Sequence, residues 1–289
     1  MTPGIKPESI LDRTINADFL EIAPNLPRAF VDLLIVDPPY NLAKNYNGRA
    51  FRKTDHADYQ AYTDSWLDRV LPLLKSDASI YVCADWQTSV SLAPVLERRL
   101  NVRNRITWQR EKGRGANANW KNCTEDIWFA TVGSSWHFDL EAVMIKRRVI
   151  APYREEGQPK DWEETDDGRF RKTCPSNFWD DISIPYWSMP ENTDHPTQKP
   201  EKLLAKLILA SCPPGGVVFD PFLGSGTTSV AAKKLGRRFC SVEIDEEYCL
   251  WAEKRLALAE TDKAIQGYAG NVFWERNTTA EQRRARDHR

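Results

Sequence analysis

Several features that define common protein classes are missing from this sequence of 289 residues. Its longest apolar runs are only as long as a β-strand and its mean hydropathy is -0.57, so no segment is expected to span a membrane. Residues 1–9 lack the basic-then-apolar order of a secretion signal, which favours a cytoplasmic protein. Because 40 Lys and Arg residues balance 41 Asp and Glu residues, the net charge of -1 neither favours nor excludes nucleic acid as a partner.

Metal-binding spacing is missing as well. The six cysteines include no Cys-x-x-Cys pair, and the four histidines are equally scattered. No set of ligands at zinc-site spacing can be assembled from them. The sequence therefore predicts no metal site and mostly buried, reduced thiols.

The most informative stretch that is present is an aliphatic run followed by an abrupt turn. Residues 33–36 are four consecutive aliphatic residues, which is typical of a strand buried on both faces of a parallel sheet. Pro38 and Pro39 end that strand, because proline cannot donate to the ladder and restricts the residue before it. Asp37 and Tyr40 are thereby fixed at the carboxyl end of a strand, where open α/β sheets bind their ligands. The alternative is a plain strand-ending turn with Tyr40 packed as a lid.

Strands and helices alternate along much of the chain, which predicts an α/β fold. Asp18 precedes Asp37 by 19 residues, enough for one helix at about 20–30 and a turn, and so for a right-handed β-α-β unit. Asp18 suits either a helix N-cap or a ligand contact. The other expected elements are helices at 59–74, at 89–100 (interrupted by Pro94), after Pro200 and at 246–259, and strands at 78–84, 105–108, 126–131, 217–220 and 239–244.

A second turn motif follows a later buried strand. Asp220-Pro221-Phe222-Leu223-Gly224-Ser225-Gly226 opens a helix, and its two glycines allow a tight turn and close approach of the backbone to a ligand. It lacks the Gly-Lys-[Ser/Thr] of a Walker loop and the third glycine of a dinucleotide fingerprint. The next strand ends at Glu243, 17 residues after Gly226, a position suited to bind two ribose hydroxyls. The motif therefore favours a nucleoside-type ligand over a plain strand-to-helix turn.

Positive charge is concentrated in one segment. Residues 98–121 contain eight Lys or Arg residues and a single acid. Arg110, Lys112 and Arg114 stand in its glycine-bearing centre, which suits contacts to phosphates. The alternative is a solvated charged surface.

Residues 132–192 differ in composition from the rest of the chain. They are rich in Trp, Pro, Arg and Asp and show no clear period. So long a span without regular structure is usually functional or disordered, and its aromatic content argues against disorder. We interpret this span as an inserted recognition region.

The order of these motifs resembles that of the β-class DNA amino-methyltransferases, which use S-adenosylmethionine. In that class Asp-Pro-Pro-Tyr precedes the cofactor motif, and His195-Pro196-Thr197-Gln198-Lys199-Pro200 is close to a signature of the family. The resemblance covers nearly all of residues 14–260. It implies a Rossmann-like methyltransferase sheet with helices on both faces, a circularly permuted motif order and an inserted target-recognition region. The implied division is a catalytic half (1–131), the recognition insertion (132–193), a cofactor-binding half (194–262) and a C-terminal tail (263–289) that is polar and frayed from residue 275.

The resemblance also implies S-adenosylmethionine as the cofactor. Glu243 would bind its ribose and Asp18 its adenine side, while Thr197 and Lys199 would hold its methionine carboxylate. A cation at the start of a helix opposes the helix dipole, so a bound carboxylate would explain Lys199. The other residues implied to line the cofactor are Phe222, Gly224, Ser225, Gly226 and Thr227.

The implied reaction is methylation of N6 of an adenine in double-stranded DNA. The amino nitrogen is a poor nucleophile because its lone pair is delocalised into the ring. The Asp37 carboxylate and the Pro38 carbonyl would accept both amino hydrogens and aim a tetrahedral nitrogen at the methyl group. The base would have to flip out of the duplex and stack on Tyr40. Candidate guanine readers in the major groove are Arg147, Arg148 and Arg154.

Three alternatives stand beside this prediction. An N4-cytosine DNA methyltransferase is one, because Asp-Pro-Pro-Tyr only tends toward adenine. An RNA amino-methyltransferase is another, although such enzymes usually carry the cofactor motif first. A non-catalytic DNA-binding module on this fold is the third, and the intact Asp37, Tyr40 and loop glycines argue against it. The sequence shows no endonuclease-like segment and no added C-terminal domain, which leaves open a homodimer that grips DNA.

Overall fold

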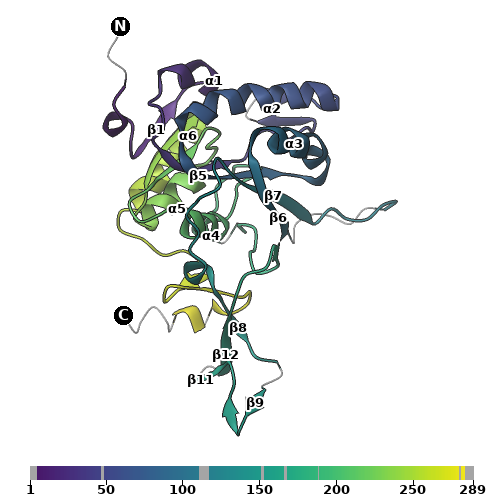
Figure 1. The fold of residues 1–289 in the computed structure, drawn as a ribbon, viewed down its shortest axis with the longest axis vertical. Helices are drawn as coiled ribbons and strands as arrows, with labels where there is room; N and C mark the ends of the chain where they lie inside the picture. Colours follow the sequence, from purple (N-terminus) through teal and green to yellow (C-terminus); the bar gives the residue numbers. More distant parts are fainter. Residues whose placement is uncertain are drawn as a thin grey trace.

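The computed structural model of the protein describes residues 5–46, 49–110, 117–150, 153–165, 168–187, 189–279 and 281–283 (Figure 1). Its centre is an eight-stranded sheet in the order β1-β15-β14-β2-β5-β7-β6-β13. All neighbouring pairs are parallel except the two that β7 makes. In that order the strands are Arg13–Asn16, Arg238–Glu243, Val217–Asp220, Val31–Val36, Leu74–Ala84, Thr124–Thr131, Asn101–Gln109 and Phe178–Trp179.

Two strands that are far apart in the sequence lie side by side at the centre. β14 pairs with β2 in parallel register, with Val218 opposite Leu33 and Phe219 opposite Leu34. Both strands are buried apolar runs, so their register is fixed by burial on both faces. The Asp37 motif and the Asp220 motif therefore leave the carboxyl ends of adjacent strands.

Helices cover both faces of the sheet, as predicted. Leu34 and Val36 point to the face that α2 and α3 cover, whereas Leu33 and Ile35 point to the face that α4, α5 and α6 cover. The helices are α1 (Phe19–Ile22), α2 (His56–Val70), α3 (Trp86–Arg99), α4 (Glu201–Ser211), α5 (Thr227–Lys234) and α6 (Glu246–Leu258). The 3₁₀ turns are η1 (Pro7–Ser9), η2 (Ala23–Asn25), η3 (Leu71–Leu73) and η4 (Glu141–Val143).

Three local predictions differ from the structure. The helix expected at 20–30 is only α1 followed by η2, because Pro24 and Pro27 cannot continue an α-helix. Pro94 does not interrupt α3, which begins at Trp86 after Asp85 caps it and continues to Arg99. The polar span after Tyr40, for which the sequence predicts no strand, contains the hairpin strands β3 (Lys44–Tyr46) and β4 (Arg49–Phe51).

An arm projects from the sheet at the bottom of Figure 1. It is built on a second sheet in the order β11-β12-β8-β17-β16, and a two-stranded hairpin of β9 and β10 lies beyond it. The strands are β8 (Ile145–Arg148), β9 (Arg154–Glu155), β10 (Gln158–Pro159), β11 (Glu163–Thr165), β12 (Gly168–Thr173), β16 (Tyr268–Ala269) and β17 (Val272–Trp274). Apart from β8 and β12 these strands have only two or three residues, too few for the sequence to show a period of two.

The C-terminal segment takes part in this second sheet. Phe273 of β17 pairs with Ile145 of β8, which ties the predicted tail to the predicted recognition region. Three residues of the tail are buried: Thr278, Glu281 and Gln282. The described part of the tail is therefore packed, whereas the sequence had predicted a frayed tail. The division into four sequence segments stays a prediction. None of the helices described combines the length and the apolar composition needed to cross a bilayer.

Candidate active site

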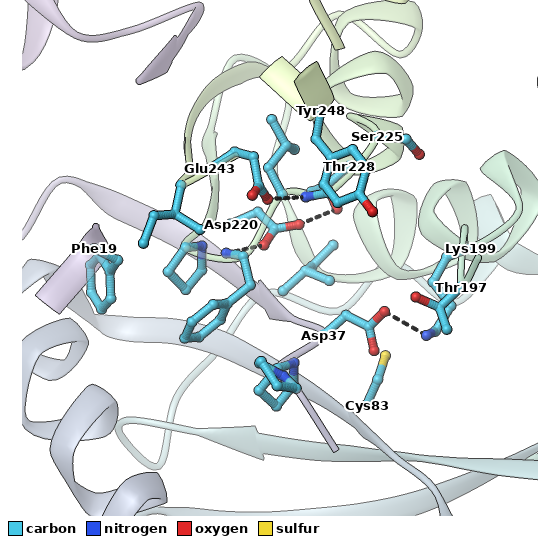
Figure 2. Close-up of a pocket in the computed structure, with 18 of the residues that line it drawn as sticks. Phe19, Asp37, Cys83, Thr197, Lys199, Asp220, Ser225, Thr228, Glu243 and Tyr248 are labelled. Atoms are coloured by element: carbon cyan, nitrogen blue, oxygen red, sulfur yellow. Dashed lines mark hydrogen bonds and ion pairs between the residues drawn. The ribbon is translucent and has the colours of Figure 1, made fainter. Parts of the chain in front are cut away.

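A cavity of about 330 Å³ opens where the two motifs leave the sheet (Figure 2). Its wall combines the turn after β2, the turn after β14, the end of β15 and the segment before α4. Of the predicted catalytic and cofactor residues all except Gly226 line it: Asp18, Asp37, Pro38, Tyr40, Thr197, Lys199, Phe222, Gly224, Ser225, Thr227 and Glu243. The tertiary structure therefore brings residues from both ends of the chain into one site.

The carboxylate of Asp37, the predicted catalytic residue, is held on both sides. The Tyr40 hydroxyl donates to Oδ1 of Asp37 at 2.9 Å, and the Lys199 ammonium donates to Oδ2 at 2.6 Å. The ammonium also lies 3.2 Å from the Tyr40 oxygen. Lys199 thus contacts the catalytic motif directly, and its predicted role at a methionine carboxylate stays a prediction.

A second carboxylate, which the sequence did not indicate, completes this cluster. Glu125, at the start of β7, is 3% exposed. One of its oxygens, Oε2, lies 3.4 Å from the Lys199 ammonium and 3.5 Å from the Tyr40 hydroxyl, and the other pairs with Arg110. The only signal in the sequence is an acidic residue just before the strand expected at 126–131, and acidic residues at strand ends are too common to single out.

Burial and charge set the protonation states of this cluster. Burial alone would lower the pKa of Lys199, but the carboxylates of Asp37 and Glu125 outweigh burial and raise it, so the lysine stays cationic. Burial, together with the same two carboxylates, raises the pKa of the Tyr40 phenol well above its usual value, so the tyrosine stays neutral. The cluster therefore pairs two anions with two cations, Lys199 and Arg110.

The glycine loop after β14 is fixed by Glu243. The Gly224 N–H donates to Oε2 of Glu243 at 2.6 Å, and the Asp245 N–H donates to Oε1 at 2.9 Å. An ionised carboxylate accepts more than two hydrogen bonds, so ribose hydroxyls can still bind to it. Glu243 therefore shapes the loop as well as facing the cavity.

Two aromatic rings close the cavity above this loop. Gly224 has a φ of +56°, and a Cβ there would lie 3.0 Å from Nε2 of His195. The His195 ring packs edge-on against Tyr248, with centroids 4.5 Å apart. Burial lowers the pKa of His195 to about 4, so it presents a neutral imidazole.

Gly226 differs from its predicted role. It has a φ of +92° and precedes α5, and a Cβ there would lie 2.6 Å from Cβ of Ala252 in α6. Gly226 therefore serves the close packing of the loop on α6 and lies outside the lining of the cavity.

Asp220 is a further site residue that was not among the predicted ones. Oδ2 accepts a hydrogen bond of 2.6 Å from the Thr228 hydroxyl, and Oδ1 accepts one of 3.0 Å from the Phe222 N–H (Figure 2). Burial raises the pKa of Asp220 to about 7. It is the first residue of the quoted motif, so the sequence contained it without indicating its role in fixing the turn.

One buried arginine joins the glycine loop to the segment that carries Lys199. Arg255 of α6 donates to the Ser225 carbonyl at 2.8 Å and to the Thr227 hydroxyl at 3.0 Å. Its other nitrogen donates to Glu201, the first residue of α4, at 3.1 Å. Asp18, at another wall of the cavity, caps α1 by accepting from the Leu20 N–H at 2.8 Å, so its N-cap role does not exclude a ligand contact.

The side chains that line the cavity suit S-adenosylmethionine in their chemistry. Glu243 supplies acceptors for ribose hydroxyls, and Phe222 and Phe19 supply apolar rings. The cavity is open to Asp37 at one end and to the glycine loop at the other, so it can hold a nucleoside beside a reacting group.

Four of the predicted DNA contacts are described, and none of them lines the cavity: Arg110 directly follows β6, and the other three lie on the arm. Arg110 pairs with Glu125, and Arg147 lies 3.0 Å from Asp180. Arg148 pairs with Glu281. Arg154 donates to the Gly157 carbonyl at 3.0 Å and lies over the Trp162 ring. Lys112 and Arg114 fall outside the described residues.

Comparison of the sequence with known protein families identifies the family of this chain. The family model described as DNA methylase, N6_N4_Mtase, matches residues 31–254, which span both motifs. The chain belongs to this family. Its confirmed features are the DNA methyltransferase activity, the methyltransferase fold and S-adenosylmethionine as the cofactor.

Individual relatives of this DNA methylase agree with the family match. It is 30% identical over 247 residues to type II methyltransferase M.HpaI of Haemophilus parainfluenzae, covering 84% of this chain and 74% of that protein. It is 30% identical over 258 residues to DNA adenine methyltransferase YhdJ of Escherichia coli strain K12, covering 85% and 82%. The structure of M1.HpyAVI in complex with SAM superposes with a TM-score of 0.56 at 25% identity, covering 84% of this chain and 99% of that one.

Proposed function

We propose that this DNA methylase transfers a methyl group from S-adenosylmethionine to N6 of an adenine flipped out of duplex DNA. The observation that carries the proposal is the position of Asp37 and Pro38 in the same cavity as the glycine loop. The choice of adenine is supported by Asp-Pro-Pro-Tyr and by the 30% identity to the adenine methyltransferase YhdJ.

The cofactor would lie along the turn after β14. Glu243 would accept hydrogen bonds from its ribose, and Phe222 would pack against its adenine, with Asp18 at the far side. Thr197 and Lys199 would face its methionine carboxylate. Gly224, Ser225 and Thr227 complete this wall, while Gly226 holds the loop against α6.

When bound, S-adenosylmethionine supplies an electrophilic methyl group. Asp37 and the Pro38 carbonyl hold the two hydrogens of the target amino group, which keeps its lone pair directed at the cofactor side of the cavity. The fixed negative charge of Asp37 stabilises the positive charge that grows on the nitrogen during transfer. The Tyr40 ring supplies a stacking surface for the flipped base. As the new carbon–nitrogen bond forms, the bond from sulfur to the methyl group breaks and its electron pair stays on the sulfur. One amino proton then passes from the product nitrogen, by way of Asp37, to water.

DNA recognition is proposed for the arm and the end of β6. Arg147, Arg148 and Arg154 each have a partner within the protein, so a base or phosphate would have to replace that partner. The Arg147–Asp180 pair is partly exposed and stabilises the fold only weakly, so its exchange costs little. Exchanging the partner of Arg148 costs more, because Glu281 is buried. Arg110, together with Lys112 and Arg114, is proposed to contact phosphates next to the flipped base.

Two finer statements complete the proposal. The enzyme acts in the cytoplasm, where its proposed DNA substrate is present. It grips the duplex as a homodimer, because one arm offers a small basic surface on its own. Sedimentation of the protein with and without a DNA duplex tests the second statement.

The test of the function is transfer of labelled methyl from S-adenosylmethionine to unmethylated duplex DNA, followed by nucleoside analysis. We expect the label in N6-methyladenine. Label in N4-methylcytosine would keep the family and overturn the base, and label in RNA alone would overturn the substrate.

A further inference from the structure

Glu125 is a buried carboxylate that touches the catalytic cluster from outside both motifs. It pairs with Trp108 across β6 and β7, so its backbone is fixed within the central sheet. Its Oε2 faces the Lys199 ammonium at 3.4 Å and the Tyr40 hydroxyl at 3.5 Å. Burial of a carboxylate costs free energy, and Glu125 is only 3% exposed. Its position facing Lys199 and Tyr40 therefore indicates a role beyond stability.

The hydrogen bonds of Asp37 indicate the role of Glu125. In the structure both of its oxygens are occupied, Oδ1 by the Tyr40 hydroxyl and Oδ2 by Lys199. The proposed function requires Asp37 to accept a hydrogen from the target amino group. At least one of the two partners must therefore leave it when the base arrives.

Lys199 cannot leave Asp37 without another anion. Lys199 is 8% exposed, and an unpaired buried charge costs much free energy. Glu125 offers that anion at 3.4 Å, less than one ångström farther than the 2.6 Å contact with Asp37. Unlike the proposed methionine carboxylate of the cofactor, Glu125 belongs to the protein and is fixed on the central sheet. A small movement of one flexible side chain therefore exchanges one carboxylate for the other.

We propose that Glu125 is a positioning residue that takes over Lys199 when Asp37 engages the amino group of the target base. This inference rests on the proposed function, because it needs an amino group at Asp37. Glu125 acts through Lys199 and does not touch the reacting atoms. Arg110 pairs with the other oxygen of Glu125, which holds that carboxylate in place.

A double-mutant cycle on Glu125 and Lys199 tests the inference. Single-turnover methyl transfer is measured at saturating DNA and S-adenosylmethionine for the wild type, Glu125→Gln, Lys199→Met and the double variant. In the Glu125→Gln variant Lys199 stays on Asp37, so the rate constant should fall by about 10- to 100-fold. In the Lys199→Met background Asp37 is already free of the lysine. The same Glu125→Gln change should then alter the rate constant by no more than about twofold.

Two outcomes overturn the inference: a wild-type rate for Glu125→Gln, or an equal loss in both backgrounds. Equal losses would mean that Glu125 acts independently of Lys199, as a structural residue or on DNA. Thermal unfolding and calorimetric binding of S-adenosylmethionine show whether each variant is folded. If Glu125→Gln does not fold, Glu125→Asp, which keeps the charge on a shorter side chain, takes its place in the same cycle.

The wild-type product separates failure of this inference from failure of the proposed function. N4-methylcytosine in that reaction would overturn the choice of adenine. The double-mutant cycle would still decide the role of Glu125, because a cytosine also presents an amino group. N6-methyladenine with additive losses would keep the function and reject the role of Glu125.

Discussion

The Tyr40 hydroxyl donates a hydrogen bond of 2.9 Å to Oδ1 of Asp37, three positions earlier in the chain. Pro38 and Pro39 make that short closure rigid, since each fixes its own φ. One turn thus places both Asp37, the proposed acceptor for the target amino group, and Tyr40, the proposed stacking ring for the target base. Changes to the two residues should have separable effects.

Replacing Asp37 by Ala should lower the rate of methyl transfer by at least about 10²- to 10³-fold, because the fixed acceptor of the amino group is lost. Binding of S-adenosylmethionine should change little, since the predicted ribose ligand Glu243 lies on another strand. Single-turnover kinetics measure the first effect and titration calorimetry the second. Retained transfer in this variant would contradict the proposed mechanism.

Tyr40→Phe and Tyr40→Ala form a matched pair that separates the hydroxyl from the ring. Phe keeps the stacking surface, whereas Ala should weaken binding of the flipped base by about 1–3 kcal/mol. Fluorescence of 2-aminopurine at the target position, once that position has been identified from methylated DNA, reports how much base is flipped. Equal fluorescence for the two variants would argue that Tyr40 does not stack on the base.

Gly226→Ala should destabilise the fold and weaken cofactor binding. Its φ of +92° disfavours a side chain, and the new Cβ would lie 2.6 Å from that of Ala252. Gly236→Ala is the control, because Gly236 has a φ of +70° with open space around it. We expect about 1–2 kcal/mol of lost unfolding free energy for the control, and about 1–3 kcal/mol more for Gly226→Ala. Urea unfolding measures both, and equal losses would mean that the contact with Ala252 relaxes without cost.

Asp220→Asn should change how stability depends on pH. The pKa of Asp220 is raised to about 7 in the folded protein from an ordinary 3.8, so its stabilising contribution is full below about pH 4 and is lost as the pH rises through 7. Each unit of displacement corresponds to about 1.4 kcal/mol. The variant lacks this contribution, so its unfolding free energy should rise relative to that of the wild type between pH 4 and 7.

Comparing the unfolding free energies of the wild type and Asp220→Asn at each pH separates the contribution of Asp220 from that of His195. The pKa of His195 is lowered to about 4, so His195 adds stability as the pH rises from 4 to 6.5, in both proteins alike. Thermal or urea unfolding across this range gives the difference. A difference that does not vary with pH would show that Asp220 is ionised throughout.

Much of the central sheet could be predicted because its strands are strongly patterned. The apolar run at 33–36 and the similar run at 217–219 can only be buried on two faces, and prolines follow both. The arm could not be predicted, since its strands are short and some are held by distant partners: Val272–Trp274 is three residues long and pairs with Ile145–Arg148. Likewise Pro24 and Pro27 shortened a helix whose existence the spacing had suggested.

The sequence by itself determined the chemistry that is present: an acidic turn, a glycine turn and their order along the chain. Each of these is local, because proline and glycine act on the backbone within a few residues. Only the tertiary structure decided which groups meet at the site. Lys199 reaches Asp37 across 162 positions and Glu125 reaches Tyr40 across 85, through contacts that no spacing in the sequence encodes. Such contacts arise because adjacent parallel strands end at the same edge of a sheet, whatever their separation along the chain.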